Sequence, residues 1–467
     1  MIQKIIAVLN SYVWGAPLMV LLVGTGFYLT IRMCCVQFRG FRHSVKILRG
    51  TYDDEKDPGE ITHFQALSAA LSATIGTGNI VGVAAAILMG GPGAVFWMWV
   101  TAIVGMATKF TSCTLAVHFR RIDETGEAHG GPMHFIRIGM GSKYKWLAAL
   151  FAFFAMMASF GSGNMFQINS VVVSLNSLCR GGSDPSPVFN VTVGTIIAIL
   201  VGFVILGGIK SIGRFASKIV PVMCLFYITG GMVILMKNVT AIPAAFQTIF
   251  YYAFHAPEAL AGGLLGTVIR SGVARGLFSN EAGLGSAAMA HGAAKTKEPV
   301  REGLVAMLGP FIDTICICSM TALVIIITGA CEVCSVKGSL TSKAFEVGLG
   351  SSVGSKFVAI AIIFFAFSTL ISWSYYGDRA VDYLFGKKGV RPYRYMYLVF
   401  IIFGAVMKIG PIIDFCDTMN GLMAVPNLIA LMVLSPVVAV LTKDYFKRMK
   451  KREASSVEMD LDIGMNN

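Results

Sequence analysis

The sequence has little charge and few long polar stretches. Charged residues make up 13% of its 467 residues, whereas hydrophobic residues make up 55%. Soluble domains usually carry about 25% charged residues, so this composition excludes an ordinary soluble protein. The longest polar stretches, residues 35–62 and the segment after Thr442, are too short to form a separate soluble domain. We therefore expect one all-α bundle of membrane-spanning helices.

The chain also lacks the motifs of several enzyme classes. It contains no H-E-x-x-H motif, no pair of membrane aspartates, no nucleophile with a nearby histidine and no nucleotide-binding strand before its glycines. We therefore expect neither an enzyme nor a bound cofactor. A channel would need a continuous polar lining, but the polar interruptions in this sequence are single and local.

The ten cysteines do not form a metal motif. Most of them are scattered through apolar segments, where a small hydrophobic side chain explains them. Cys331 and Cys334 lie together in a predicted loop, but two ligands without a second pair are a weak zinc signal. A disulfide or loop packing is the preferred interpretation of this pair.

Apolar segments long enough to cross a bilayer make up most of the sequence. The first, residues 12–33, is too long for a signal peptide and ends on Arg32, so we interpret it as a retained helix. In total the sequence predicts eleven spans, centred near residues 23, 77, 106, 162, 198, 226, 276, 315, 366, 400 and 427.

The net charge of +13 indicates the orientation of these spans. Most of the 38 basic residues fall in alternate loops, and such residues accumulate on the cytoplasmic side of a membrane. The predicted topology has the N-terminus outside and the C-terminus in the cytoplasm of a cell bounded by this plasma membrane. The basic residues are thereby explained without nucleic acid. The basic loops are residues 32–56, 120–145, 210–218, 295–301, 379–394 and 443–452.

Two predicted spans contain helix-breaking sequences in matching positions. One is "GTGN" at residues 76–79, and the other is "GLFSNEAGLG" at residues 276–285. Each opens a block of five spans, and the two blocks enter the membrane from opposite sides, which is typical of inverted-repeat transporters. Close helix packing is the alternative use of such glycines. The predicted parts are residues 1–61, the repeats 62–237 and 238–442, and a cytoplasmic tail 443–467.

The first break offers a defined chemistry. Irregular backbone in a membrane is tolerated where it lines a cavity. We expect the amides of Gly78, Asn79 and Ile80 to be free and to point from a helix N-terminus at a carboxylate. The carbonyl groups of residues 72–75 lose their helical partners and can face a small cation. A carboxylate-bearing substrate that moves with a cation fits this pairing.

Other polar residues occur at a similar depth. Asn164, Gln167 and Ser170 form a polar stripe that either donates to a substrate or bonds neighbouring helices. Ser368 and Thr369 offer adjacent hydroxyl groups, which either bind the cation or bond the carbonyl four residues back.

Five segments together resemble the alanine or glycine:cation symporter family: "LSATIGTGNIVGVA", "GGPGAVFWMW", "GGPMHFI", "RGLFSNEAGLGSAAMAH" and "STLISWSYYG". This resemblance covers nearly the whole chain and implies a five-plus-five inverted repeat with one extra N-terminal helix. It also implies a sodium-driven symporter for small neutral amino acids. Its implied substrate residues are Thr74, Gly76, Thr77, Gly78, Asn79, Phe166, Gln167, Phe278, Ser279 and Trp373. Its implied sodium ligands are Ser72 and Ile75, through backbone carbonyls, and Ser368 and Thr369.

The coupling ion and the substrate size follow from bulk and charge. The first break has no titratable group, which favours Na⁺ over H⁺, although Glu281 and Asp313 are intramembrane acids that would suit proton coupling. Phe166, Phe278 and Trp373 around a glycine-rich backbone favour glycine, alanine or serine.

Four charged residues lie towards the predicted outer side of the second repeat. We interpret them as separate solvated charges, with an outer gate pair as the alternative. They are Arg270, Arg275, Asp414 and Asp417.

Overall fold

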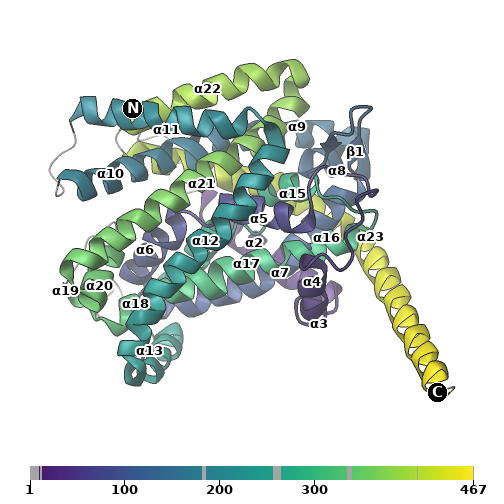
Figure 1. The fold of residues 1–467 in the computed structure, drawn as a ribbon, viewed down its shortest axis with the longest axis horizontal. Coiled ribbons are helices and arrows are strands. Elements are labelled where there is room, and N and C mark those ends of the chain that lie inside the picture. The colour runs from purple at the N-terminus through teal and green to yellow at the C-terminus, as the bar shows by residue number, and fades with distance from the viewer. Residues whose placement is uncertain are drawn as a thin grey trace.

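The computed structural model is an almost entirely helical bundle (Figure 1). It describes residue 10 and residues 13–180, 186–255, 265–333, 339–407 and 409–465. The described strands are two residues long and form one hairpin, β1 (Arg121–Ile122) with β2 (Ala128–His129). The predicted all-α class is therefore confirmed.

The first half of the chain contains one broken helix and several continuous ones. Its elements are α2 (Ala16–Arg32), α3 (Val36–Arg39), α4 (Phe41–Leu48), α5 (His63–Thr74), the 3₁₀ turn η1 (Thr77–Asn79), α6 (Val81–Gly90), α7 (Ala94–His118), α8 (Pro132–Gly139), η2 (Ser142–Tyr144), α9 (Lys145–Phe160), the π-helical η3 (Gly161–Met165), α10 (Phe166–Arg180), α11 (Pro187–Ile205) and α12 (Gly208–Lys237).

The second half also contains one broken helix, α14 (Leu265–Asn280) with α15 (Ser286–His291), and several continuous ones. Its elements are η4 (Val239–Ala241), α13 (Ile242–Phe254), α14 (Leu265–Asn280), α15 (Ser286–His291), α16 (Pro299–Ala306), α17 (Leu308–Pro310), the π-helical η5 (Phe311–Cys318), α18 (Ser319–Ile327), α19 (Ala330–Val333), α20 (Leu340–Leu349), α21 (Ser351–Phe385), α22 (Lys387–Val406) and α23 (Ile409–Met465).

The membrane spans agree only in part with the predicted number. Among the described residues, seven helices are long and apolar enough to cross a membrane, or eight if the bent pair of α5 with η1–α6 is one span. Each of the eleven predicted centres falls in a helical element. Some of these elements are too short for that test, such as α2 with 17 residues. Eleven spans therefore stays a prediction.

Local sequence explains where the first broken helix starts. Thr62 Oγ1 accepts the amide N–H of Gln65 at 3.2 Å, and Gln65 Oε1 accepts the amide N–H of Thr62 at 3.1 Å. This capping box satisfies amides that lack a partner in the first turn of α5. The helix then packs against α12 and α21.

The interior and the periphery of the bundle differ in burial. Helix α7 is 89% buried along its most apolar window and packs against α14, α16 and α2. By contrast, Phe203 on α11 is 78% exposed and Leu225 on α12 is 68% exposed. Large apolar side chains exposed in this way are expected where a helix faces lipid.

The predicted cytoplasmic tail continues the last helix. Helix α23 runs through the predicted boundary at residue 443 without ending there. Its C-terminal part projects away from the bundle as the long yellow helix of Figure 1.

Candidate functional site

The first predicted break interrupts the helix. Helices α5 and α6 are separated by η1, and their axes differ by 62°. A Cβ atom at Gly76 would lie 3.0 Å from Thr369 Oγ1 and 3.5 Å from Gln167 Oε1. Glycine therefore lets side chains of α21 and α10 approach the backbone of the break.

The amides of the break correct part of our expectation. The N–H of Asn79 donates to Gly76 O at 3.2 Å, and the N–H of Ile80 donates to Thr77 O at 3.3 Å. Two of the three amides expected to be free are therefore occupied, because a 3₁₀ turn still forms bonds to the residue three before it. In the described part of the chain, the amide of Gly78 has no backbone acceptor.

Asn79 holds the break together. Its Oδ1 accepts the amide N–H of Gly76 at 3.0 Å, and its Nδ2 donates to Asp313 Oδ1 at 2.7 Å. The residue is fully buried. In this conformation the Asn79 side chain therefore supports the loop, and its predicted contact with substrate stays a prediction.

The residues predicted to bind a cation lie around the end of α5. Thr369 Oγ1 donates to Ser72 O at 3.0 Å, and Ser72 Oγ donates to Ser368 O at 2.8 Å. Ile75, the fourth, has φ −75° and ψ 91° and is fully buried. Thr369 Oγ1 also donates to Phe365 O at 2.9 Å, so the back-bonding alternative holds for it too. These neutral oxygens form a set that suits a small hard cation.

Four of the predicted substrate residues line one cavity of about 330 Å³. They are Thr77, Gly78, Phe166 and Phe278. A Cβ atom at Gly78 would lie 3.5 Å from the Phe278 ring. Gln167 adjoins them, since Thr77 Oγ1 donates to Gln167 Oε1 at 3.4 Å. The structure therefore brings residues of η1, α10 and α14 together.

Three further predicted substrate residues are buried beside the break without lining this cavity. Trp373 Nε1 donates to Ala73 O at 3.3 Å. Ser279 Oγ donates to Asp313 Oδ2 at 2.8 Å. Thr74 Oγ1 bonds within its own helix, to Ala70 O at 3.1 Å. These three side chains are thus occupied by protein partners in this conformation.

The second predicted break begins later than Phe278 and Ser279. Helix α14 continues to Asn280, and the chain then turns through Glu281, which has a positive φ of 53°, before α15 starts at Ser286. Glu281 Oε2 accepts a hydrogen bond from Ser286 Oγ at 2.5 Å. This contact matches the interpretation in which Glu281 ties the interrupted backbone together.

Asp313 connects the first break to the last turn of α14, which leads into the second break. This buried acid on η5 accepts from Asn79 Nδ2 through Oδ1, and Oδ2 accepts from Ser279 Oγ and Thr314 Oγ1, both at 2.8 Å. The sequence signals Asp313 as an acid in an apolar run, but its contacts with Asn79 and Ser279 were not predicted. A shared carboxylate of this kind makes the geometries of the two breaks interdependent.

The three residues of the polar stripe, Asn164, Gln167 and Ser170, have different hydrogen-bond partners. Asn164 Nδ2 donates to Tyr397 O at 2.7 Å, and Ser170 Oγ donates to Phe166 O at 3.0 Å. Gln167 bonds Thr77 of the first break, and Ser170 lines the cavity beside that break. For Asn164 the interhelical alternative therefore holds.

The charged residues of the second repeat are not all separate solvated charges, which corrects our preferred interpretation. Arg275 and Asp417 line the cavity beside the first break, whereas Arg270 lines a different cavity against α2. Asp414 Oδ1 accepts from Asn10 Nδ2 at 3.4 Å. Of the predicted cysteine pair, Cys334 lies outside the described residues.

The other end of the broken helices is closed by a buried cluster. Glu302 on α16 is fully buried and accepts hydrogen bonds from two imidazole rings, Nδ1 of His63 and Nδ1 of His291, the latter at 2.5 Å. His63 begins α5, and His291 ends α15. One carboxylate thus joins the far ends of the two interrupted helices.

A guanidinium group reinforces this closure. Arg120 donates to four backbone carbonyl groups, at distances between 2.5 and 3.0 Å. They belong to Pro58, Gly292, Ala294 and Thr296. These bonds tie the end of α7 to the loops that flank α5 and α15.

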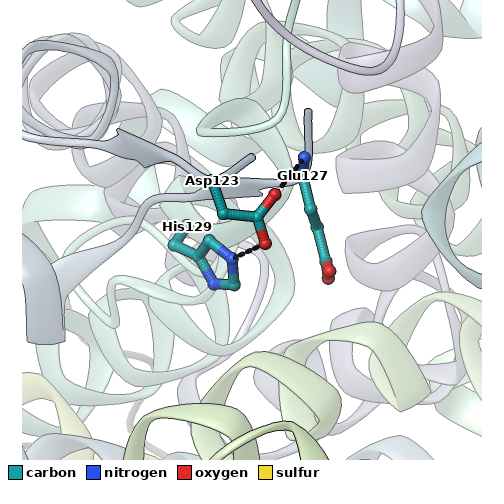
Figure 2. Close-up of side chains that lie close together, drawn as sticks. All are labelled: Asp123, Glu127 and His129. Carbon is teal, nitrogen blue, oxygen red and sulfur yellow. Dashed lines mark hydrogen bonds and ion pairs between the residues drawn. The ribbon is translucent and has the colours of Figure 1, made fainter. Parts of the chain in front are cut away.

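A metal-like cluster beside this region is an ion-pair network. Figure 2 shows the Asp123 carboxylate between the His129 ring and the backbone of Glu127, an arrangement typical of metal ligands. Lys387 Nζ contacts Asp123 and also lies 3.1 Å from Glu127 Oε2, so an ammonium group already neutralises these carboxylates. The hydrogen bond to Asp382, 2.8 Å long, raises the pKa of His129.

Curated proteins similar to this chain are transporters or are named as such. A sodium/alanine symporter, AgcS, of Methanococcus maripaludis is 46% identical, with 97% of this chain and 99% of that protein covered. A probable sodium/glutamine symporter, GlnT, of Bacillus subtilis is 37% identical over 96% of this chain and 92% of its own length. A putative sodium/proton-dependent alanine carrier protein, YrbD, of Bacillus subtilis is 34% identical over 99% and 96%.

A solved structure shares the fold at low sequence identity. The crystal structure of MhsT in complex with L-phenylalanine has a TM-score of 0.56 and 11% identity, and it covers 82% of this chain and 98% of its own. The model of the sodium:alanine symporter family matches residues 1–459. The chain is accordingly a multi-pass transport protein, not an enzyme. It belongs to the sodium:alanine symporter family.

Proposed function

We propose that this protein is a sodium-coupled symporter that imports small neutral amino acids, alanine or glycine, by alternating access. The observation that carries the proposal is the first break. Gly78 lines the cavity, while the oxygens of Ser72, Ser368 and Thr369 gather around the end of α5 that leads into the same loop. A carboxylate and a cation bound there would lie close enough for each to favour the other.

The remaining predicted residues complete this site. Asn79, Ser279 and Trp373 surround the break, and Gln167 with Phe166 and Phe278 bounds the cavity beside it. Rigid rings around a glycine-rich backbone leave space for a small side chain, which supports glycine, alanine or serine as substrate. The sodium/alanine symporter of Methanococcus maripaludis supports the same substrate class.

The topology is part of the proposal. We propose eleven spans in a plasma membrane, with the N-terminus outside and the C-terminus inside, and a five-plus-five repeat over residues 62–237 and 238–442. Two observations support this arrangement: helices α5–α6 and α14–α15 are both interrupted, and Asp313 bonds Asn79 in the first break and Ser279 on α14. The cavity beside Gly78 then opens towards the outside, and the Glu302 cluster faces the cytoplasm.

Proton coupling is the second candidate. Asp313 favours it, because this buried carboxylate bonds Asn79 in the first break and Ser279 on α14 and has only neutral donors as its hydrogen-bond partners in the described chain. A relative named as a putative sodium/proton-dependent alanine carrier points the same way. The neutral oxygens around Ser72 favour Na⁺, which we keep as the main proposal.

Counterflow of labelled alanine in proteoliposomes tests both candidates. The purified full chain is assayed with a sodium gradient, with a pH gradient at equal sodium, and without sodium. We expect saturable exchange only with sodium, with glycine and serine as competitors and phenylalanine without effect. Exchange that persists without sodium and follows the pH gradient would establish proton coupling instead.

A further inference from the structure

Two opposite charges lie in the cavity that borders the first break. We call this cavity the vestibule; its lining includes Thr77, Gly78, Phe166 and Phe278 of the proposed central site and also Arg275 and Asp417. Arg275 lies on α14 and Asp417 on α23, so two separate elements deliver the charges. Nothing in the proposed central site uses either of them.

Both charged groups are incompletely bonded in the described structure. Asp417 is only 8% exposed, yet its Oδ1 has no hydrogen-bond partner among the described residues, and the same is true of the buried Nε of Arg275. No ion pair within 4.0 Å joins them, although both line the same space. A buried carboxylate oxygen without a partner is costly, so it requires a functional reason.

The neighbouring charges do not satisfy this pair. Arg270, five residues before Arg275, lines the other cavity, and Asp414 bonds Asn10. The rest of the vestibule wall carries no charge: it is apolar on α6, with Val81, Gly82 and Ala85, and α10 adds the hydroxyl groups of Ser170 and Ser174. A ligand that satisfies both charges must therefore carry one charge of each sign within a short distance.

We propose that Arg275 and Asp417 form an outer binding site for the zwitterionic head group of an amino acid. The guanidinium group would receive the carboxylate, which it can bond through two N–H groups, and Asp417 would receive the ammonium group. The substrate occupies this site before it reaches the break. This inference rests on the proposed function, because it assigns that function an earlier binding step.

The position of Phe278 supports such a sequence of steps. Its ring centroid lies 5.9 Å from the guanidinium carbon of Arg275, one helical turn before it, and the same ring lies against Gly78. Phe278 thus contacts both the outer charge and the backbone of the break. A zwitterion held by Arg275 would therefore lie beside the ring that contacts the break.

The test compares Arg275→Gln and Asp417→Asn with Arg270→Gln and Asp414→Asn in the full chain, reconstituted in proteoliposomes. Initial uptake of labelled alanine is measured against alanine concentration at saturating sodium. Loss of one charge-assisted contact should raise the half-saturating concentration about tenfold in each vestibule variant. The maximal rate should stay within about twofold, and both control variants should match the wild type.

Competition by half-ligands separates recognition from a structural effect. Propionate carries only the carboxylate, and ethylammonium carries only the cation. Propionate should inhibit the wild type and Asp417→Asn but not Arg275→Gln, whereas ethylammonium should inhibit the wild type and Arg275→Gln but not Asp417→Asn. Should Arg275→Gln fail to fold, Arg275→Lys replaces it and should retain inhibition by propionate.

Each other outcome overturns the inference. Vestibule variants that match the wild type, or that lose maximal rate at an unchanged half-saturating concentration, would assign the pair to packing or to gating. Inhibition by both half-ligands in every variant would also overturn it. If the wild type takes up no alanine with sodium, the proposed function itself fails, which is distinct from variants that behave like an active wild type.

Discussion

The two ends of the broken helices differ in how their polar groups are bonded. Beside η1 and the end of α14 lies the vestibule, where Arg275 and Asp417 have unpartnered atoms. At the far ends of α5 and α15, Glu302 takes hydrogen bonds from two histidines, and Arg120 bonds four carbonyl groups. The first end therefore contains buried polar atoms without a protein partner among the described residues, whereas the other end is held by polar bonds that must break before it can open.

This difference indicates which end of the broken helices resists opening. Hydrogen bonds to a buried charge contribute more than those between neutral groups, so the closed end resists opening. Alternating access requires that something weaken these bonds once the substrate is bound. Asp313 bonds both Asn79 in the first break and Ser279 in the last turn of α14, so it joins the two interrupted helices at the end where the ligands would bind.

The largest expected effect is at the closed end. Glu302→Gln replaces the carboxylate between two imidazole Nδ1 groups by an amide, which cannot accept equally from both. Breaking such a buried charged cluster should lower stability by about 3 kcal/mol. Thermal unfolding in detergent measures it, with Glu298→Gln as the control, because Glu298 pairs with exposed Arg448 and should cost less than about 1 kcal/mol. Equal stability of the two variants would contradict a bonded closure.

Next in size is the link between the two interrupted helices. Asp313→Asn should reduce the initial rate of alanine uptake by about 10- to 100-fold, since Asn79 and Ser279 lose their shared anionic acceptor. Asp444→Asn, on an exposed part of α23, provides the control. Wild-type uptake by the Asp313 variant would separate the two breaks.

The predicted cation site follows. Thr369→Ala removes a hydroxyl group that bonds Ser72 O, and it should raise the half-saturating sodium concentration about tenfold, more than that of alanine. Ser374→Ala on the same helix is the matched control, because Ser374 Oγ bonds only Ile371 O among the described residues. An equal rise for both ligands would indicate distortion of the site instead of lost ligation.

A smaller effect concerns substrate size. Trp373→Leu enlarges the space beside Ala73 and should improve competition by larger amino acids such as valine about tenfold relative to alanine. Trp97→Leu is the control. The Trp97 indole donates to Ala253 O, at 3.0 Å, and this contact is not part of either break. An unchanged order of competitors would remove Trp373 from the pocket.

The smallest effect lies in the ion-pair network around β2. Hydrogen bonding to Asp382 raises the pKa of His129, so the protonated ring adds stability at low pH, and this is lost as pH rises through that pKa. His129→Gln should therefore lower stability at pH 6 by up to about 1 kcal/mol and less at pH 9. A larger loss at pH 9 in thermal unfolding would reverse the assigned sign.

The two breaks could be predicted from glycine and polar residues in apolar runs. The same pattern predicted that Ser72, Gly76, Gln167 and Thr369 lie together at the first break. The occupied amides of Asn79 and Ile80 were not predictable, because the choice between free backbone and a 3₁₀ turn depends on neighbouring helices. The same holds for the contacts of Glu302, whose histidine partners lie 239 and 11 residues away in sequence.

The π-helical segments η3 and η5 have a consequence for how this protein can change. Each accommodates a residue more than an α-helix would; η5 carries Asp313, and η3 ends two residues before Gln167. Deleting one residue within 161–165 would restore a regular α-helix and turn every preceding side chain relative to every following one by about 100°. A single codon lost there would thus rotate Gln167 out of the break, and it would also disturb the hydrogen bond from Gln167 Nε2 to Ser162 O.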